Sequence, residues 1–412
     1  MPNVVGIVAE YNPFHNGHLY HLIESKNQAS ADYTIAVISG NFVQRGDVSI
    51  IDKWSKTEMA LKNGIDLVIE LPTLYSISSA ENFAYGSMRI LDSLGIVNAV
   101  SFGTEQASVD TLDKFATVLF NEPKEYISVL NHELSKGISY PKARENALLL
   151  YLNDIRKYAN VLSSPNNILG IEYLKALKKL KSNMIPIAIP RNKVGYNSND
   201  IIDGFASATS IRQMLITRNT KNIHKVMPES SYEILNNCVS NGQYVSSIAQ
   251  YEKEIIYVLR KMSVEEIANI PDVTEGLENL IKEAANSCNN IQEFINIVKS
   301  KRYTQTRIQR ILVYALLGIT KKDMINLNKT APYIRVLGFN SKGRDLLSAI
   351  VSENPKLNII TSVKKFIDSN NNNKNLLSIL QKDIFATNVY TLGYEYDSIS
   401  NLDYTKKLIT LL

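Results

Sequence analysis

The chain has 412 residues, a formal net charge of +5 at pH 7, and 45% hydrophobic against 21% charged residues. This composition is typical of a soluble globular protein with two or three domains, and the mild charge permits a polyanionic partner without requiring one. The two cysteines lie far apart and outside any C-x-x-C pattern, which argues against a disulfide framework and a cysteine zinc site. The N-terminus lacks a signal-peptide pattern and no apolar run is long enough to span a membrane, so a cytoplasmic protein is predicted.

Short apolar runs alternate with helical patterns through the first quarter of the chain. The runs that predict buried strands are residues 3–11, 33–40, 66–72 and 98–105. The stretches with helical spacing between them are residues 17–28, 58–64 and 80–95. Strands that alternate with helices in this way predict an α/β fold with a doubly wound parallel sheet. Ligands of such sheets bind beyond the carboxyl ends of the strands.

The pattern changes further along the chain. Residues 108–182 are predicted to be mostly helical, residues 183–191 return to a strand, and residues 203–216 run from a loop into a helix. After residue 220 helical patterns dominate. We therefore predict two domains, an α/β domain over residues 1–220 and a mainly helical C-terminal domain over residues 221–412.

The first predicted strand ends in the stretch EYNPFHNGH, which holds two of the five histidines, His15 and His18. A purely structural role, in which these residues close the strand and start the helix, is one interpretation. A metal site with His15, His18 and His21 is a second, because residues three apart on a helix share a face. The third is phosphate chemistry, since a loop that enters a helix offers free N–H groups and a positive dipole end. No P-loop or G-x-G-x-x-G pattern occurs elsewhere in the chain.

A second short stretch has the same character. SATSIR, at residues 207–212, places hydroxyl groups at a predicted helix start and an arginine one turn later. Alone it is equally compatible with a capped surface helix. If it meets a triphosphate, Thr209, Ser210 and Arg212 are the groups that would grip the β- and γ-phosphates.

The H-x-G-H stretch followed by SATSIR resembles the two motifs of the HIGH nucleotidyltransferase superfamily, which includes the class I aminoacyl-tRNA synthetases. Further segments extend the likeness over nearly the whole chain to the family of tRNA(Met) cytidine acetate ligases. These segments are SGNFVQRGD, DKWSKTEMAL, DLVIELP, FGTE, SPNNILGIEYLKAL, IPR and KRYTQTRIQRIL. Such enzymes activate acetate with ATP, giving acetyl-adenylate and pyrophosphate, and then acetylate N4 of the wobble cytidine of elongator tRNA(Met).

The resemblance implies an ATP site as well. Its residues would be Ile7, Val8, Ala9, Glu10, Tyr11, Asn12, Pro13, Phe14, His15, Asn16, Gly17, His18, Leu19, Gly103, Asn166 and Arg191. We expect His15 and His18 to stabilise the transition state of adenylyl transfer and Gly17 to give the nucleotide access to the backbone. We also predict a catalytic role near phosphate or acetate for Lys53, and Mg²⁺ bound with ATP on charge grounds.

A basic stretch in the second half suggests RNA binding. Residues 294–322 hold seven basic side chains and no acidic ones. Those predicted to contact tRNA are Lys299, Lys301, Arg302, Arg307 and Arg310. A cluster of this kind neutralises phosphates, although a solvated helix face would show the same pattern.

Two other functions fit parts of the sequence. An adenylyltransferase that acts on a small phosphorylated substrate would use the same two motifs but has no need of the basic second half. A non-catalytic RNA-binding protein would keep the nucleotide pocket without turning ATP over.

Overall fold

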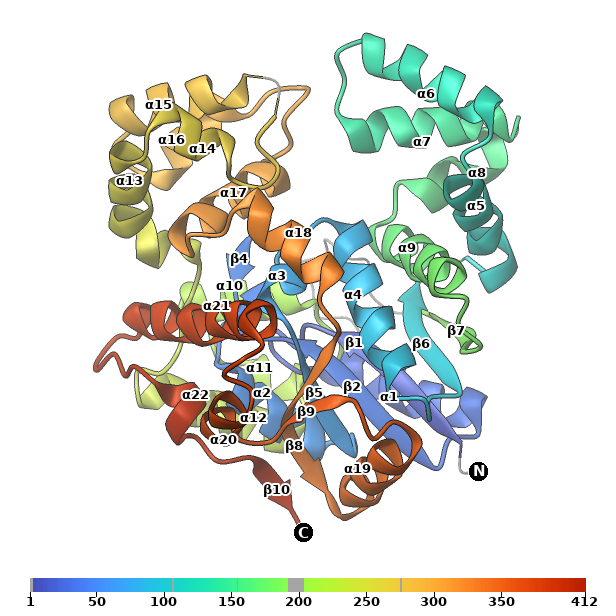
Figure 1. Cartoon of the computed structure of the whole chain (residues 1–412), viewed down its shortest axis with the longest axis vertical. Coiled ribbons are helices and arrows are strands. Elements are labelled where there is room, and N and C mark those ends of the chain that lie inside the picture. Colours follow the sequence, from blue (N-terminus) through green and yellow to red (C-terminus); the bar gives the residue numbers. More distant parts are fainter. Residues whose placement is uncertain (1–2, 106, 154, 192–203, 275) are drawn as a thin grey trace.

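The computed structural model describes residues 3–105, 107–153, 155–191, 204–274 and 276–412. Their centre is an eight-stranded sheet in the order β10-β8-β5-β2-β1-β6-β7, with β9 beside β8 (Figure 1). Its strands are β1 (Val4–Ala9), β2 (Tyr33–Ser39), β5 (Leu67–Leu71), β6 (Ala99–Thr104), β7 (Ile185–Pro190), β8 (Tyr333–Asn340), β9 (Asn358–Ile360) and β10 (Ile409–Leu411). β3 (Phe42–Val43) and β4 (Asp47–Val48) form a separate antiparallel hairpin.

Helices cover both faces of the sheet because its strands are apolar on both sides. Ile35 and Val37 point into one core, whereas Ala36 and Ile38 point into the other. The helices of the first core that lie against the sheet are α4 (Ala80–Ser93), α5 (Val109–Asn121), α9 (Pro165–Leu180) and α19 (Ser341–Glu353). Those of the second core are α1 (Asn16–Ala29), α2 (Lys53–Lys62), α10 (Ala208–Ile216), α11 (Ile223–Val226) and α12 (Glu229–Ser240).

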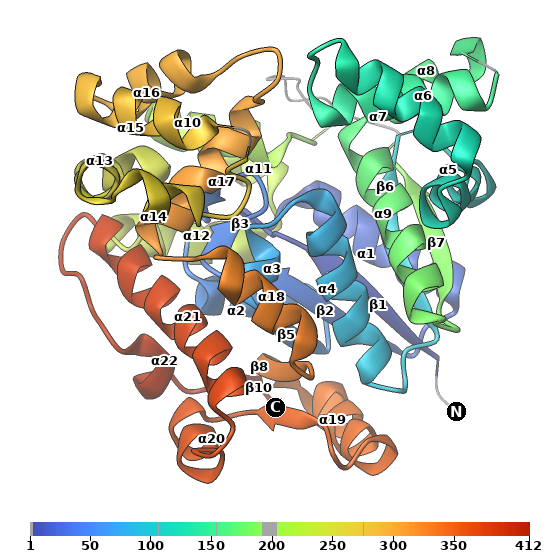
Figure 2. The same ribbon diagram turned by 45° about the horizontal axis from the view of Figure 1, so that its top comes forward.

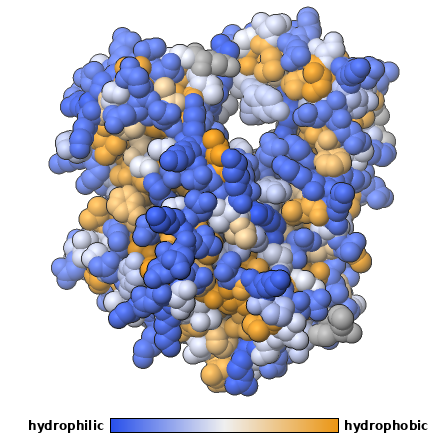
Figure 3. Space-filling model, in the orientation of Figure 1, coloured by the Kyte–Doolittle hydropathy of each residue, from blue (hydrophilic) through white to orange (hydrophobic). Residues whose placement is uncertain are grey.

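Two groups of helices stand apart above the sheet (Figures 1 and 2). The first group comprises α6 (Lys124–Ser135), α7 (Tyr140–Tyr151) and α8 (Ile155–Leu162). The second comprises α13 (Glu252–Lys261), α14 (Val264–Ala268), α15 (Leu277–Ser287), α16 (Ile291–Val298) and α17 (Gln305–Leu316). Figure 3 shows the molecular surface hollowed between them. The remaining elements are α3 (Thr73–Ser76), η1 (Ile248–Tyr251), α18 (Lys321–Lys329), α20 (Val363–Ser369), α21 (Lys374–Tyr390), η2 (Thr391–Gly393) and α22 (Leu402–Thr405).

The predicted α/β class is confirmed, and every predicted strand and helix of the first half is present within a few residues of its expected ends. The C-terminal half, however, is not purely a helical appendage. β8 pairs antiparallel with β5, and β9 and β10 pair with β8, so both halves contribute to one sheet. The predicted boundary near residue 220 therefore divides the sequence but not the sheet.

The strand order places a crevice at one point of the sheet edge. β1 lies between β2 and β6, and the chain order of the parallel strands reverses on passing from one side of β1 to the other. In open α/β sheets ligands bind at such a switch point, beyond the carboxyl ends of the strands. The residues that follow β1 and β6 are therefore expected to line a ligand site.

Candidate active site

A cavity of about 510 Å³ lies at this switch point. Its walls come from the ends of β1, β6 and β7, the start of α1, α9 and α10, the β3–β4 hairpin and α17. The residues of the predicted site that line it are Val8, Ala9, Glu10, Tyr11, Asn12, His15, Gly17, His18, Gly103, Asn166, Arg191, Thr209 and Arg212. The cavity thus brings together most of a residue set that spans two hundred positions of the sequence.

His15 and His18 cap the start of α1 through their rings. The N–H of Gly17 donates to Nδ1 of His15 at 3.0 Å, and the N–H of His15 donates to Nδ1 of His18 at 3.2 Å. The two rings stack with their centroids 3.8 Å apart. Because each Nδ1 is an acceptor, the network assigns the proton of each neutral ring to Nε2. Each histidine is therefore held as a fixed Nε2–H donor.

Gly17 is needed for this arrangement. A Cβ at this position would lie 2.8 Å from Cε1 and 3.0 Å from Nδ1 of His15, so the stacked ring leaves no room for a side chain. Gly17 lines the cavity. A larger residue at this position would clash first with the ring of His15.

Burial keeps the histidines uncharged. Burial, and then the positive charges of Arg191 and Arg212, lower the pKa of His15 to about 3. The pKa of His18 lies well below its usual value, chiefly through burial and then through His15. Burial and Arg191 lower the pKa of His21 to about 4. In the unliganded cavity the positive charge thus belongs to the arginines, while the imidazoles act as neutral donors.

The two arginines reach the cavity from different elements. Arg191 follows β7, its N–H donates to the carbonyl oxygen of Thr104 at 2.9 Å, and its side chain lies over Gly103. Arg212 on α10 donates from Nη1 to the carbonyl oxygen of Asn12 at 2.8 Å and from Nη2 to Oγ1 of Thr209 at 3.3 Å. Arg212 therefore joins the start of α10 to the loop that precedes α1.

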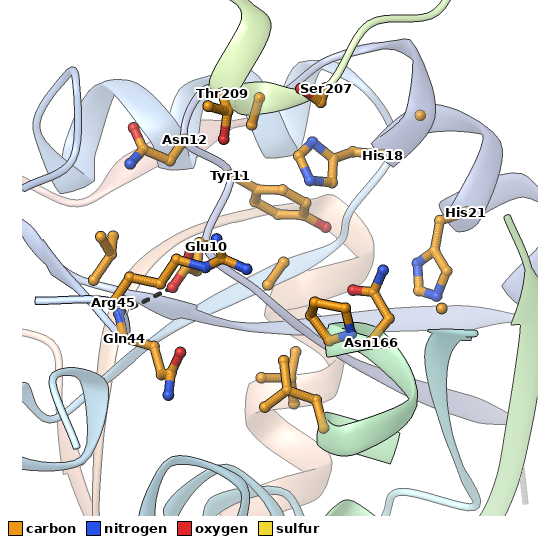
Figure 4. A pocket seen from close by; sticks show the side chains of 18 of the residues that line it. Glu10, Tyr11, Asn12, His18, His21, Gln44, Arg45, Asn166, Ser207 and Thr209 are labelled. Atoms are coloured by element: carbon orange, nitrogen blue, oxygen red, sulfur yellow. Dashed lines mark hydrogen bonds between the residues drawn. The ribbon is translucent and has the colours of Figure 1, made fainter. Parts of the chain in front are cut away.

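The opposite wall is the start of α9. Asn166 donates from Nδ2 to Oε1 of Glu105 at 2.6 Å, which fixes the amide at the cavity edge. Figure 4 shows Asn166 and His21 on one side of the cavity and Thr209, Ser207 and Asn12 on another.

Six residues of the predicted ATP site do not line the cavity, namely Ile7, Pro13, Phe14, Asn16, Leu19 and Ser210. Ile7 and Phe14 are buried in the second core. Asn16 donates to the carbonyl oxygens of Gly204 and Lys225, so it joins α1 to the loop before α10 and to α11. The N–H of Ser210 donates to Oγ of Ser207, which is the cap of α10. These residues support the wall behind the cavity.

Lys53, which was predicted to act near phosphate or acetate, lies outside the cavity wall. Its ammonium group is fully buried between Oε1 of Glu70 at 2.9 Å and Oδ1 of Asp403 at 2.8 Å, and the residue does not line the cavity. Lys53 instead fastens α22, near the C-terminus, to the first half of the chain.

Lys56, one turn further along α2, holds the strand ends under the cavity. Its Nζ donates to the carbonyl oxygens of Glu10, Ser39 and Gly40 at 3.0, 2.7 and 2.7 Å. Burial lowers the pKa of Lys56 to about 7. This lysine joins the carboxyl ends of β1 and β2, a role that the sequence analysis missed because nothing local marks the three carbonyl groups as its partners.

The β3–β4 hairpin and α17 supply lining residues that were not predicted individually. They are Val43, Gln44, Arg45, Asp47, Thr306 and Arg310, the last of which was predicted only as an RNA contact. A signal existed for the hairpin, because SGNFVQRGD directly follows a predicted strand. No local signal connected α17 with the cavity.

The predicted RNA-binding residues fall into two classes. Lys299, Lys301 and Arg302 are exposed in the loop between α16 and α17, which lies on the side of its group that faces α6 and α7 (Figure 2). Arg307 and Arg310 are half-buried and bind Asp272. Nη2 of Arg310 lies 2.7 Å from Oδ2, and Nε of Arg307 donates to the carbonyl oxygen at 2.9 Å. The basic stretch has no acidic residue of its own, and Asp272, in the loop between α14 and α15, supplies the carboxylate that pairs with Arg310.

In the described part of the chain, no three His, Cys, Asp or Glu side chains are grouped so that they could hold a metal ion. His15, His18 and His21 line one cavity but do not form such a group. Within the same residues, no helix is both long and apolar enough to cross a membrane.

The chain was compared with known proteins. The model of the HIGH Nucleotidyl Transferase family matches residues 2–404. A protein of Thermoanaerobacter sp. (strain X514) named tRNA(Met) cytidine acetate ligase is 46% identical over 408 residues, which cover 99% of this chain and 100% of that protein. One of the same name from Caldanaerobacter subterraneus subsp. tengcongensis is 44% identical, with 99% of each chain covered.

Solved structures resemble the chain over the same extent. The apo crystal structure of Thermotoga maritima TmcAL has a TM-score of 0.94 and 33% sequence identity, with 99% of each chain covered. The crystal structure of the same protein bound with alpha-thio ATP has a TM-score of 0.91 and 34% identity, again with 99% of each chain covered.

Proposed function

The chain belongs to the HIGH nucleotidyl transferase family and, within it, to the tRNA(Met) cytidine acetate ligases, and from this we propose that it joins acetate to a tRNA cytidine at the expense of ATP. In the first step acetate attacks the α-phosphorus of ATP, giving acetyl-adenylate and pyrophosphate. In the second step the acetyl group passes to N4 of the wobble cytidine of elongator tRNA(Met), and AMP leaves.

The stacked pair of His15 and His18 is the observation that carries the first step. Adenylyl transfer builds negative charge on the α-phosphate oxygens and on the departing pyrophosphate, and fixed donors aimed at these oxygens stabilise it. The two Nε2–H groups are fixed by backbone hydrogen bonds before any ligand arrives. Arg191 and Arg212 line the same cavity and bring the positive charge that the neutral rings lack.

The start of α10 suits the β- and γ-phosphates. Thr209 and Arg212 line the cavity beside free N–H groups of the first helical turn. Ser210 acts through its position in the cap and not as a direct ligand. We expect Mg²⁺ to arrive with ATP on its phosphate oxygens, because no group of three His, Cys, Asp or Glu side chains among the described residues could hold it by itself.

The exposed basic loop suits the tRNA. Lys299, Lys301 and Arg302 lie beside the hollow between the two helical groups, where phosphates of an anticodon stem–loop would be neutralised. We propose that Arg307 and Arg310 orient the end of α17 at the cavity and contact RNA only there. A tRNA substrate also fits the predicted cytoplasmic location.

The test is acetate-dependent exchange of pyrophosphate into ATP, measured on the wild type and on His18→Asn. The asparagine oxygen can replace Nδ1 as acceptor for the His15 N–H, while the Nε2–H donor is lost. Removal of one such donor is expected to slow exchange by a factor of about 10²–10³. The matched control is His132→Asn, since His132 is exposed on α6 and is expected to leave exchange unchanged.

The outcomes separate the rival functions. Exchange that needs acetate and collapses only in His18→Asn supports carboxylate adenylation at the histidine pair. Exchange driven by a small phosphorylated substrate instead of acetate would favour the adenylyltransferase. Absence of exchange under all conditions, with tRNA added, would favour a silent RNA-binding protein.

A further inference from the structure

Glu10 is one of two carboxylates among the described residues that line the cavity, the other being Asp47. Oδ1 of Asp47 accepts from the N–H of Val48 at 2.9 Å and from the N–H of Ile248 at 2.8 Å, so this carboxylate joins the hairpin to η1. Glu10 directly follows β1 and is half-buried. Its Oε1 accepts from the N–H of Gln44 at 3.0 Å, which fixes the carboxylate in the cavity wall.

Glu10 lies away from the histidine pair. Figure 4 shows it next to Gln44 and Arg45, with the ring of Tyr11 between it and His18. The Tyr11 ring packs edge-on against His18 with centroids 5.0 Å apart. The cavity thus has a histidine end, suited to phosphate, and a Glu10 end beyond the tyrosine.

The Glu10 end of the cavity lies next to α17, the helix that follows the loop of Lys299, Lys301 and Arg302. The turn that holds Glu10, formed by residues 44–46, packs directly on α17. A Cβ at Gly46, whose φ is +72°, would lie 2.3 Å from the backbone nitrogen of Arg310. Thr306 and Arg310 of α17 line the cavity. The wall at the Glu10 end is therefore continuous with α17, the helix that follows the basic loop.

The acyl transfer needs an acceptor for one proton. N4 of cytosine carries two hydrogens and gives one up when it is acetylated, and a carboxylate is the side chain that matches such an amine. Resting on the function proposed above, we propose that Glu10 accepts a hydrogen bond from N4 of the target cytidine and removes its proton during transfer. N4 attacks the acetyl carbonyl carbon, a C–N bond forms, the C–O bond to the phosphate breaks and AMP leaves with its electron pair. The proton of N4 passes to the Glu10 carboxylate.

Other titratable groups at the cavity are less suited to this task. His15 and His18 carry their protons on Nε2, and each Nδ1 lone pair already accepts a backbone N–H. Burial, and then the charge of Glu10 itself, raises the pKa of Tyr173, so this phenol stays protonated. Lys56 uses its three N–H groups on three carbonyl oxygens. Glu10 reaches the cavity and, as a carboxylate, can take up a proton.

The experiment separates the two half-reactions in Glu10→Gln. The glutamine keeps the side-chain length and an oxygen for the Gln44 N–H, but it cannot take up the proton. Exchange of pyrophosphate into ATP with acetate is expected to fall less than about tenfold. Single-turnover acetylation of an elongator tRNA(Met) transcript by pre-formed acetyl-adenylate on the enzyme is expected to fall at least about 100-fold, as loss of a general base predicts.

Two results would overturn the assignment. A parallel loss of exchange and transfer would place Glu10 in ATP or acetate binding, and an unchanged transfer rate would exclude it as the base. Glu10→Asp carries the same test if the glutamine variant does not fold. The shorter carboxylate should slow transfer about tenfold more than it slows exchange, and an unaltered transfer rate would count against the proposal. Failure of wild-type exchange would instead refute the ligase function itself, so the two failures remain distinct.

Discussion

The histidine end of the cavity and the loop of Lys299, Lys301 and Arg302 are both proposed to meet phosphate groups, yet they are built in opposite ways. His15 is buried and His18 half-buried, and their stacked rings are held by backbone hydrogen bonds at both Nδ1 atoms. The loop side chains are exposed, and the ammonium of Lys299 bonds only a neutral neighbour, Oε1 of Gln305 at 3.3 Å.

The difference follows from what each region must do. Charge that develops in a transition state is stabilised only by donors that are already in place, because reorienting them would cost free energy during the reaction. Neutralising tRNA phosphates needs positive charge near the surface, and release of counterions supplies the free energy without a fixed geometry. Fixed neutral donors and exposed positive charges are therefore two ways to bind one chemical group.

The comparison can be broken most severely by removing the support of the strand ends under the cavity. Lys56→Met deletes the ammonium that joins the carbonyl groups of Glu10, Ser39 and Gly40. We expect a loss of about 2–4 kcal/mol in unfolding free energy, because three buried carbonyl groups lose their donor, and a loss of acetate-dependent exchange of at least about 100-fold.

Lys53→Met is the matched control on the same helix. It leaves Glu70 buried without its cation and Asp403 with Arg335 alone, at 3.4 Å, which should cost about 3–5 kcal/mol in unfolding free energy. Assayed at a temperature where circular dichroism shows both variants folded, Lys53→Met should retain exchange within about threefold, since its partners lie outside the cavity. Equal loss of exchange in the two variants would show that stability, and not position, is what Lys56 supplies.

These two lysines also show how far the sequence could lead. The parallel strands and the histidine end were predictable because EYNPFHNGH is contiguous and its strand, loop and helix are local patterns. The site of Lys53 was not, since its partner Asp403 lies 350 residues away in the sequence. Similarly, no local sequence pattern predicts that β8 pairs with β5 or that Arg310 forms an ion pair with Asp272.

The exposed loop offers a smaller effect that sharpens the contrast. Combined substitution of Lys299, Lys301 and Arg302 by alanine should raise the KM for tRNA about tenfold. The slope of log affinity for tRNA against log salt concentration should also become shallower, by the equivalent of up to about three phosphate contacts. Exchange without tRNA should not change. Filter binding across a salt series measures the slope.

Substitution of Lys356, Lys364 and Lys365 by alanine is the control for total charge. These exposed residues lie in the α19–β9 connection and on α20, and their removal changes the net charge by the same amount. Their loss should leave the KM within about twofold. If both triple variants weaken tRNA binding equally, the protein attracts tRNA through its overall charge and the loop has no special part.

The smallest effect concerns the pH dependence of stability, in which the histidines of the cavity should differ from an exposed histidine. The pKa of His15 is lowered to about 3 and that of His21 to about 4, mainly by burial, against an ordinary value of 6.5. Between these limits the unfolded chain binds a proton that the folded chain does not, so the unfolding free energy falls as the pH falls below 6.5. Each histidine should lower the unfolding free energy by about 1 kcal/mol per pH unit just below that point.

Urea denaturation at pH 7 and pH 5.5 measures this loss of unfolding free energy. The loss should be smaller for His21→Gln than for the wild type, whereas His132→Gln should match the wild type. An equal loss in all three proteins would mean that His21 takes up its proton as readily in the folded protein as in the unfolded chain, so that burial does not keep this ring uncharged.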